Sequence, residues 1–142
     1  MRSHRVLVTG AAGFVGRYAM AALRSKLCGD SALLGIGRTA NPSHAEADFQ
    51  VIDLSDKSAL RKCIADFAPT HILHLAAQAS VKQGGYAVAE TWQANVGGLL
   101  NLAQAAMSEA RGRHLYLSAQ AKYTAVHSCQ VNLSTRRLRR IR

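Results

Sequence analysis

No apolar run in this sequence reaches the roughly 18–20 residues that a membrane-spanning helix requires. The first four residues lead directly into an apolar segment, so no signal peptide is expected. Cysteines are scarce: Cys28, Cys63 and Cys129 are scattered and odd in number, which argues against a disulfide framework and against a zinc site. Reduced thiols, no bound metal and a cytoplasmic protein are therefore expected.

Acidic residues are missing from the end of the chain. All eight lie before Lys122, together with twelve of the eighteen lysines and arginines. The formal charge of +10 therefore splits into about +4 for residues 1–121 and about +6 for residues 122–142. Because the excess charge is confined to a short tail, no nucleic-acid partner is expected for the domain. A tail that binds nucleic acid, with an affinity that falls steeply with salt, is the alternative.

Apolar segments alternate with helical periodicity along a chain whose 142 residues and 49% hydrophobic content suit one domain with a core. Strands are predicted at 6–8, 32–36, 49–52, 71–75 and 114–117. Helices are predicted at 14–27 with a C-cap at Gly29, from a cap at Ser55 or Asp56 to Phe67, and at 88–110, with a loop at 41–48. This order predicts an α/β fold, a doubly wound parallel sheet covered by helices on both faces.

Three glycines follow the first predicted strand and precede a helix: Gly10, Gly13 and Gly16. Gly10 would permit a sharp turn, Gly13 would let a pyrophosphate approach the backbone, and Gly16 would let the helix lie close to the strand. The first-turn amides and the positive end of the helix dipole would then face the anion. A turn that binds nothing is the alternative, but its position between a strand and a helix favours a phosphate site.

Polar or small residues also follow the other predicted strands, at Arg38, Asp53, Ala76 and Ser118. Since the carboxyl ends of parallel strands share one edge, these residues and Gly10 are expected to line one ligand site. The small residues from Ala76 onward would leave room for a flat ligand, and close helix packing is the alternative explanation for them.

Arg38 lies about twenty residues beyond Gly16, where dinucleotide-binding units read the adenosine ribose. An acidic residue at this place would bind the 2′-hydroxyl of NAD, whereas an arginine suits the 2′-phosphate of NADP. NADP is therefore slightly favoured over NAD, and a solvated loop arginine is the alternative.

These motifs together resemble the extended short-chain dehydrogenase/reductase family of NAD(P)-dependent epimerases, dehydratases and reductases that act on nucleotide sugars. Residues 9–16 resemble its cofactor signature TGxxGFxG, Asp53-Leu54 resembles its adenine-contacting pair, and residues 74–78 resemble its HLAAQ run beside the nicotinamide. Asn95 resembles its structural asparagine, and Ser118 lies where the fifth strand leads to the catalytic serine or threonine. The resemblance covers roughly residues 6–121 and is greatest to the GDP-mannose dehydratase and GDP-hexulose reductase group.

The resemblance implies a Rossmann-type fold, truncated after about the fifth strand, and hydride transfer between NAD or NADP and a sugar carbon. A nucleotide sugar is the implied substrate, a homodimer is the expected assembly, and Ser118 is the implied catalytic hydroxyl, although Ala119 or Gln120 could occupy the equivalent place. The implied cofactor-binding residues are Thr9, Gly10, Gly13, Phe14, Val15, Gly16, Arg38, Asp53, Leu54, Leu75, Ala76, Ala77, Gln78 and Asn95.

The sequence departs from the family at its catalytic pair, Tyr-x-x-x-Lys. The residues four positions after the four tyrosines are Ala22, Glu90, Gln120 and His127, and none is lysine. The chain also stops before the family's sixth and seventh strands and its substrate domain. The chain itself is therefore expected to be catalytically incompetent, and a non-catalytic module that senses NAD(P) or binds a partner is the alternative.

Residues 122–142 have no coherent amphipathic pattern and end in an arginine-rich run. Such runs also arise when GC-rich codons are read in the wrong frame. Codons for residues 121–127 can be chosen so that the shifted frame reads Glu-Val-Tyr-Gly-Arg-Ser, and Glu-Val-Tyr-Gly follows the fifth strand in this family. We therefore expect an incomplete NAD(P)-binding domain at 1–121, a non-native tail at 122–142 and a fifth strand exposed at the sheet edge.

Overall fold

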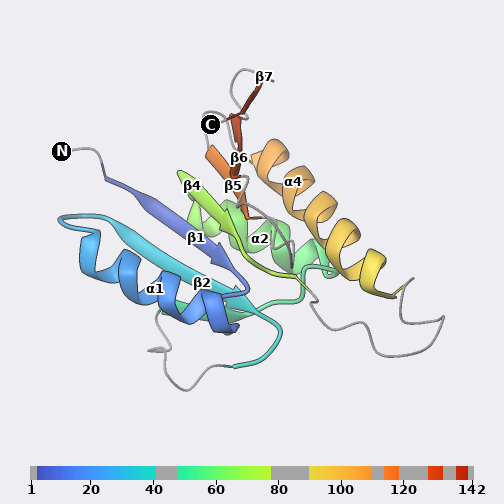
Figure 1. Cartoon of the computed structure of the whole chain (residues 1–142), viewed down its shortest axis with the longest axis horizontal. Coiled ribbons are helices and arrows are strands. Elements are labelled where there is room, and N and C mark those ends of the chain that lie inside the picture. Colours follow the sequence, from blue (N-terminus) through green and yellow to red (C-terminus); the bar gives the residue numbers. More distant parts are fainter. Residues whose placement is uncertain are drawn as a thin grey trace.

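A computed structural model shows one sheet flanked by helices (Figure 1). It describes residues 3–40, 48–77, 90–109, 114–118, 128–132 and 137–140. The strands are β1 (Arg5–Thr9), β2 (Ala32–Gly37), β3 (Phe49–Val51), β4 (His71–His74), β5 (His114–Ser118), β6 (Ser128–Asn132) and β7 (Arg137–Arg140). The helices are α1 (Phe14–Lys26), α2 (Lys57–Phe67), a π-helical turn η2 (Gln93–Gly97) and α4 (Gly98–Glu109).

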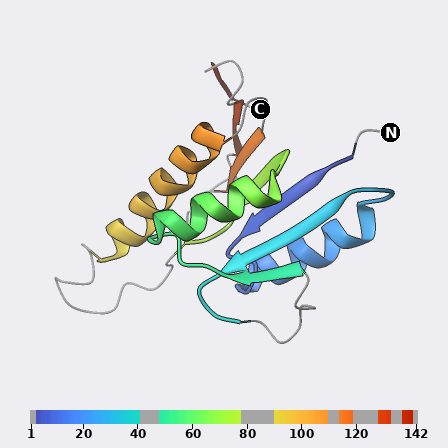
Figure 2. The ribbon, with the colours of Figure 1, turned by 180° about the vertical axis from the view of Figure 1, so that it is seen from behind.

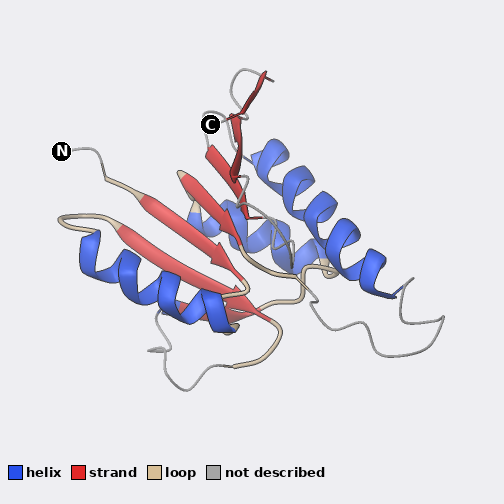
Figure 3. Ribbon diagram, in the orientation of Figure 1, coloured by secondary structure: helices blue, strands red, loops and turns tan. Residues whose placement is uncertain are grey.

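The strands run in the order β3-β2-β1-β4-β5-β6-β7. The pairs among the first five strands are all parallel, with Leu7 of β1 opposite Leu34 of β2 and Ile72 of β4. The α1 helix covers one face, and α2 and α4 cover the other, as the views from the front and from behind show (Figures 2 and 3). The predicted doubly wound, Rossmann-type α/β fold is therefore confirmed.

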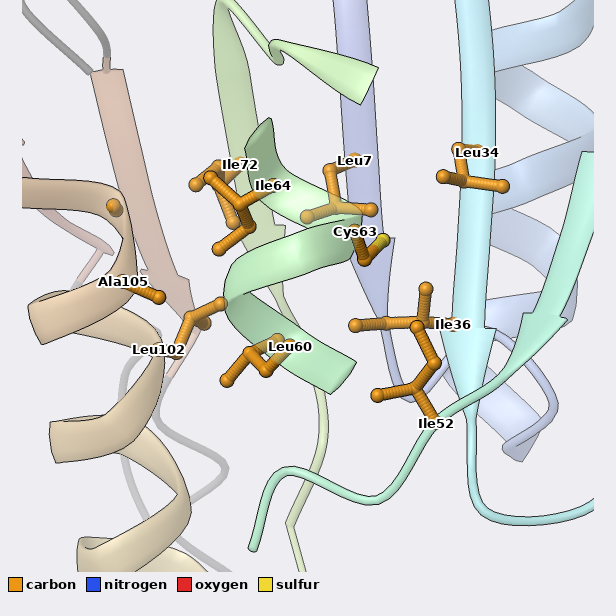
Figure 4. Close-up of a cluster of buried hydrophobic side chains, with 11 residues drawn as sticks. Leu7, Leu34, Ile36, Ile52, Leu60, Cys63, Ile64, Ile72, Leu102 and Ala105 are labelled. Atoms are coloured by element: carbon orange, nitrogen blue, oxygen red, sulfur yellow. The ribbon is translucent and has the colours of Figure 1, made fainter. Parts of the chain in front are cut away.

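The larger core lies between the sheet and the helices α2 and α4 (Figure 4). Leu7, Ile36 and Ile72 contribute from three strands, and Leu60 and Leu102 contribute from the two helices. None of these five side chains is accessible to solvent. Alternate residues of each strand point to one face, so the period of two in the strands and the helical period in α2 and α4 build this core together.

A smaller core lies on the opposite face, beneath α1. Val6 and Val8 of β1 pack there with Met20 of α1 and with Ala11 of the intervening turn. Val6 and Val8 point to the face opposite Leu7, because successive side chains of a strand alternate between its two faces. The β1 strand is therefore buried on both faces. A strand covered on both sides reads as a continuous apolar run, which is how it was recognised in the sequence.

Two helix ends differ in how closely they follow the prediction. The α2 helix has Asp56 as its N-cap, and Asp56 Oδ1 accepts a hydrogen bond from the Ala59 amide at 3.0 Å, as expected for one of the two predicted caps. The prediction of Gly29 as the C-cap of α1 is wrong, because the helix ends at Lys26 with Leu27 as its C-cap. Gly29 instead takes a left-handed φ of 63° in the turn that follows.

The long helix predicted at 88–110 contains an irregular turn. The described part, residues 90–109, is interrupted by η2 before α4 begins at Gly98. Glycine has no Cβ, so Gly97 and Gly98 lower the free-energy cost of this irregular turn. A Cβ on Gly98 would lie 3.2 Å from the Cβ of Leu54. Asn101 Nδ2 donates to the Leu54 carbonyl at 2.9 Å, so α4 is fixed to the segment that follows β3.

The expectation of an open sheet edge at β5 is wrong for the described residues. The β6 strand pairs antiparallel along β5, with Ser118 opposite Ser128, and β7 pairs antiparallel with β6. Strand pairing uses main-chain groups, so a segment without a hydrophobic pattern can satisfy a free edge. Within the residues described, no helix combines the length and the apolar character needed to cross a membrane.

Candidate functional site

The carboxyl ends of the five parallel strands lie at one edge of the sheet. Gly10, Arg38, Asp53 and Ala76 each follow one of these ends within two residues, and Ser118 is the last residue of β5. The structure therefore brings the predicted site residues to a common edge. Gln78 lies outside the described residues.

The glycine turn after β1 packs directly against the segment after β4. Gly10 has a left-handed φ of 69°, and a Cβ on it would lie 2.7 Å from both Cα and the amide nitrogen of Ala76. Gly10 is therefore required twice, for its conformation and for its close approach to Ala76. The space beside the small residue Ala76 is thus partly occupied by the backbone of the glycine turn, whereas the alternative explanation was close packing of a helix.

The glycine in the first turn of α1, Gly16, fits against the turn that precedes the helix. A Cβ on Gly16 would overlap the carbonyl oxygen of Gly10 and would lie 2.7 Å from Cα of Ala11. The sequence predicted that Gly16 lets the helix lie close to the strand; the contact is with the turn that leaves the strand. Gly13 is the N-cap of α1, and a Cβ on it would meet only the Gly10 oxygen, at 3.2 Å.

The N-terminus of α1 has no capping side chain. Gly13 makes no side-chain cap, the first turn holds no acidic residue, and Phe14 and Val15 leave their side chains exposed. The N-terminus of α2, in contrast, is capped by the carboxylate of Asp56. Within the described residues, the first-turn amides of α1 therefore have neither a capping side chain nor a carboxylate of their own turn, and their partial positive charge suits an anion.

Beneath this turn lies a buried contact that the sequence did not predict, between Thr9, one of the implied cofactor-binding residues, and His74, the first residue of the run 74–78. Thr9 Oγ1 lies 2.6 Å from His74 Nδ1 and accepts a hydrogen bond from the Ala76 amide at 3.3 Å. Burial lowers the pKa of His74 to about 4, so its imidazole is neutral at pH 7. The signal in the sequence was a histidine at the end of an apolar strand, whose buried ring requires a polar partner.

On the other side of the glycine turn, Arg38 and Asp53 lie exposed after β2 and β3. The Ile52 amide donates to the Gly37 carbonyl at 2.9 Å, which joins these two strand ends. The Ser55 amide donates to Asp53 Oδ1 at 2.8 Å. Hydrogen bonds from Ser55 lower the pKa of Asp53, and the positive charge of Arg38 lowers it further, so the carboxylate is ionised at neutral pH.

The remaining predicted residues are less tightly grouped. Leu75 and Ala77 flank Ala76 after β4, and Asn95 lies half-buried in η2. Leu54 packs against Gly98 and belongs to the α4 contact rather than to the open edge. For Ser118 the structure fixes the main chain, at the end of β5.

The chain matches the family model described as "NAD dependent epimerase/dehydratase family" over residues 6–139. It is 32% identical over 117 residues to UDP-glucuronate 4-epimerase 3 of Arabidopsis thaliana, covering 75% of this chain and 27% of that protein. It is 30% identical over 113 residues to dTDP-glucose 4,6-dehydratase of Neisseria meningitidis serogroup B, covering 72% of this chain and 31% of that protein.

Among solved structures, the fold is similar to that of UDP-glucose 4-epimerase of Thermus thermophilus in complex with NAD. The TM-score is 0.65 with 32% sequence identity, covering 74% of this chain and 34% of that chain. The chain thus spans about a quarter to a third of the length of these relatives. The family match covers nearly the whole chain, including the strands that carry the glycine turn and His74, and the chain belongs to the NAD-dependent epimerase/dehydratase family.

Proposed function

We propose that this chain binds a nicotinamide dinucleotide at the carboxyl edge of its sheet. The observation that carries the proposal is the glycine cradle: Gly10 and Gly16 permit contacts that no Cβ would allow, and they place the uncapped N-terminus of α1 at the open edge. Gly10, Gly13 and Gly16 would hold the pyrophosphate. Asp53 would contact the adenine, as the family resemblance implies.

The chemistry that such a cofactor supplies when bound is hydride transfer. The named relatives act on UDP-glucuronate, dTDP-glucose and UDP-glucose. We infer a nucleotide sugar as the substrate of a protein that contains this domain, with Ser118 as the hydroxyl that polarises the substrate. No tyrosine in the chain has a lysine four residues later, so we infer that this chain binds the cofactor without turning over a sugar.

Arg38 provides the test of which dinucleotide is bound. We expect NADP to bind more tightly than NAD, and Arg38→Ala to weaken NADP binding by about tenfold while NAD binding changes little, because only NADP carries the 2′-phosphate. Isothermal titration of both dinucleotides measures this. Lys26→Ala removes an exposed cation at the far end of α1 and serves as the control.

The two parts of this proposal fail separately. Absence of binding by either dinucleotide would contradict the proposed function. Tight NAD binding with no effect of Arg38→Ala on NADP would leave cofactor binding intact and overturn the preference for NADP.

A second candidate is a module that senses NAD(P) without reacting. One observation favours it: part of the basic tail forms β6 and β7 on the sheet, which is expected of a genuine segment. Against it, we infer that residues 122–142 arise from a shifted reading frame, which accounts for both the tail's charge and the missing Tyr-x-x-x-Lys.

The coding DNA distinguishes the two candidates. Reading all three frames from Leu117 onward is expected to find Glu-Val-Tyr-Gly and then Tyr-x-x-x-Lys in a shifted frame. If no frame continues in this way, the tail is genuine and the sensing module becomes the better proposal.

A further inference from the structure

Three hydrogen bonds that involve Thr9 join the end of β1 to the last residue of β4 and to the segment that follows it. The Thr9 hydroxyl contacts His74 Nδ1 at 2.6 Å and accepts from the Ala76 amide at 3.3 Å. The Leu75 amide donates to the Thr9 carbonyl at 3.1 Å. Thr9 is fully buried and His74 is 7% exposed, so water does not compete for these groups.

The direction of the shortest of these bonds is inferred from the other hydrogen bond of the Thr9 hydroxyl, because a neutral imidazole can carry its proton on either ring nitrogen. Thr9 Oγ1 already accepts from the Ala76 amide, so its own proton needs an acceptor. Since the buried imidazole is neutral, its Nδ1 can accept, and the ring proton then resides on Nε2. Thr9 therefore donates to His74 and accepts from Ala76, and the histidine orients the hydroxyl.

The position of Ala76 in turn determines the position of the glycine turn. Gly10 packs closely on the Ala76 backbone, since a Cβ on Gly10 would lie only 2.7 Å from Ala76 Cα and from its amide nitrogen. A shift of the chain after β4 is therefore transmitted to Gly10 and to the start of α1.

We propose that His74 is a positioning residue for dinucleotide binding: by accepting the Thr9 proton it holds Ala76 against Gly10 and so sets the shape of the phosphate cradle without touching the ligand. This inference rests on the proposed function. It assigns a role to a side chain that lies beneath the site rather than in it.

The surroundings of His74 allow its titration to be observed separately. Burial accounts for its lowered pKa, with no contribution from a neighbouring charge. Among the residues whose side chains the structure describes, the titratable groups on the elements around it are Arg5 on β1, His71 on β4, His114 on β5, Glu109 on α4, and Lys57, Arg61, Lys62, Cys63 and Asp66 on α2. Protonating His74 would turn Nδ1 into a donor that faces the Thr9 hydroxyl, so the cradle is expected to loosen in acid.

The test compares two substitutions of similar size. His74→Leu keeps the bulk and removes the acceptor, whereas His74→Asn places Oδ1 near the position of Nδ1 and keeps it. We expect His74→Leu to weaken NAD binding by about tenfold and to accelerate exchange of the Ala76 amide hydrogen, and His74→Asn to stay within about threefold of the parent chain. Below about pH 5 the NAD affinity of the parent chain should fall, whereas that of His74→Asn should change little.

Unchanged NAD affinity in a folded His74→Leu chain would overturn the proposal, as would equal losses in His74→Leu and His74→Asn. If the parent chain binds neither NAD nor NADP, the proposed function fails by itself. Exchange of the Ala76 amide then reports the positioning without any ligand, and an unchanged exchange rate in His74→Leu overturns it.

Discussion

Gly16→Ala is expected to remove measurable dinucleotide binding, with a loss of affinity of about 100-fold, equivalent to about 3 kcal/mol. The added Cβ would overlap the Gly10 carbonyl oxygen and crowd Cα of Ala11, and both are backbone atoms that no rotamer change can move away. The start of α1 must therefore shift away from the turn. That shift displaces the first-turn amides on which anion binding depends.

Gly29→Ala is the matched control for this substitution. Gly29, unlike Gly16, has a left-handed φ, of 63°, but a Cβ on it would meet nothing within 4 Å, and it lies beyond the opposite end of α1. We expect Gly29→Ala to lower stability by about 1 kcal/mol through backbone strain and to leave NAD affinity unchanged. Titration of NAD into both folded variants measures the difference. An NAD affinity of Gly16→Ala within threefold of that of the parent chain would contradict the proposal that the glycine turn holds the pyrophosphate.

The elements that the sequence predicted well are those whose burial is periodic. The strand ends at Thr9, Gly37 and His74 lie within two residues of the predicted ends, because apolar runs stop where the chain leaves the core. The common edge followed from parallel topology, and the glycine turn followed from its chemistry. These features are local or are fixed by the order of the elements.

The features that the sequence did not reveal depend on contacts between distant segments. The link from Thr9 to His74 spans 65 residues, and the anchoring of Asn101 on the Leu54 carbonyl spans 47. The η2 turn arises where α4 must fit against that carbonyl, and helical periodicity does not report such an adjustment. The pairing of β6 on β5 uses main-chain groups, on which the side-chain pattern carries no information.

Acid is expected to destabilise the fold between about pH 6.5 and pH 4, and this loss begins well above the ordinary pKa of carboxylates. Burial lowers the pKa of His74 from 6.5 to about 4, so in this range the unfolded chain binds a proton that the folded chain excludes. Stability is therefore greatest above pH 6.5 and falls as the pH decreases through the window, by about 3 kcal/mol in total. His71 contributes in the same direction, since burial and the charges of His114 and His4 lower its pKa.

Urea unfolding at a series of pH values measures this loss, and His74→Asn separates the contribution of His74 from that of His71. Asparagine does not titrate, so the variant should lose much less stability than the parent chain between pH 6.5 and pH 4. Asp53, whose pKa is lowered by its bonds to Ser55, contributes at the acid end of this range and below it, where its stabilising effect is lost as it takes up a proton. Equal acid sensitivity of the parent chain and His74→Asn would show that His74 is not held neutral in the folded domain.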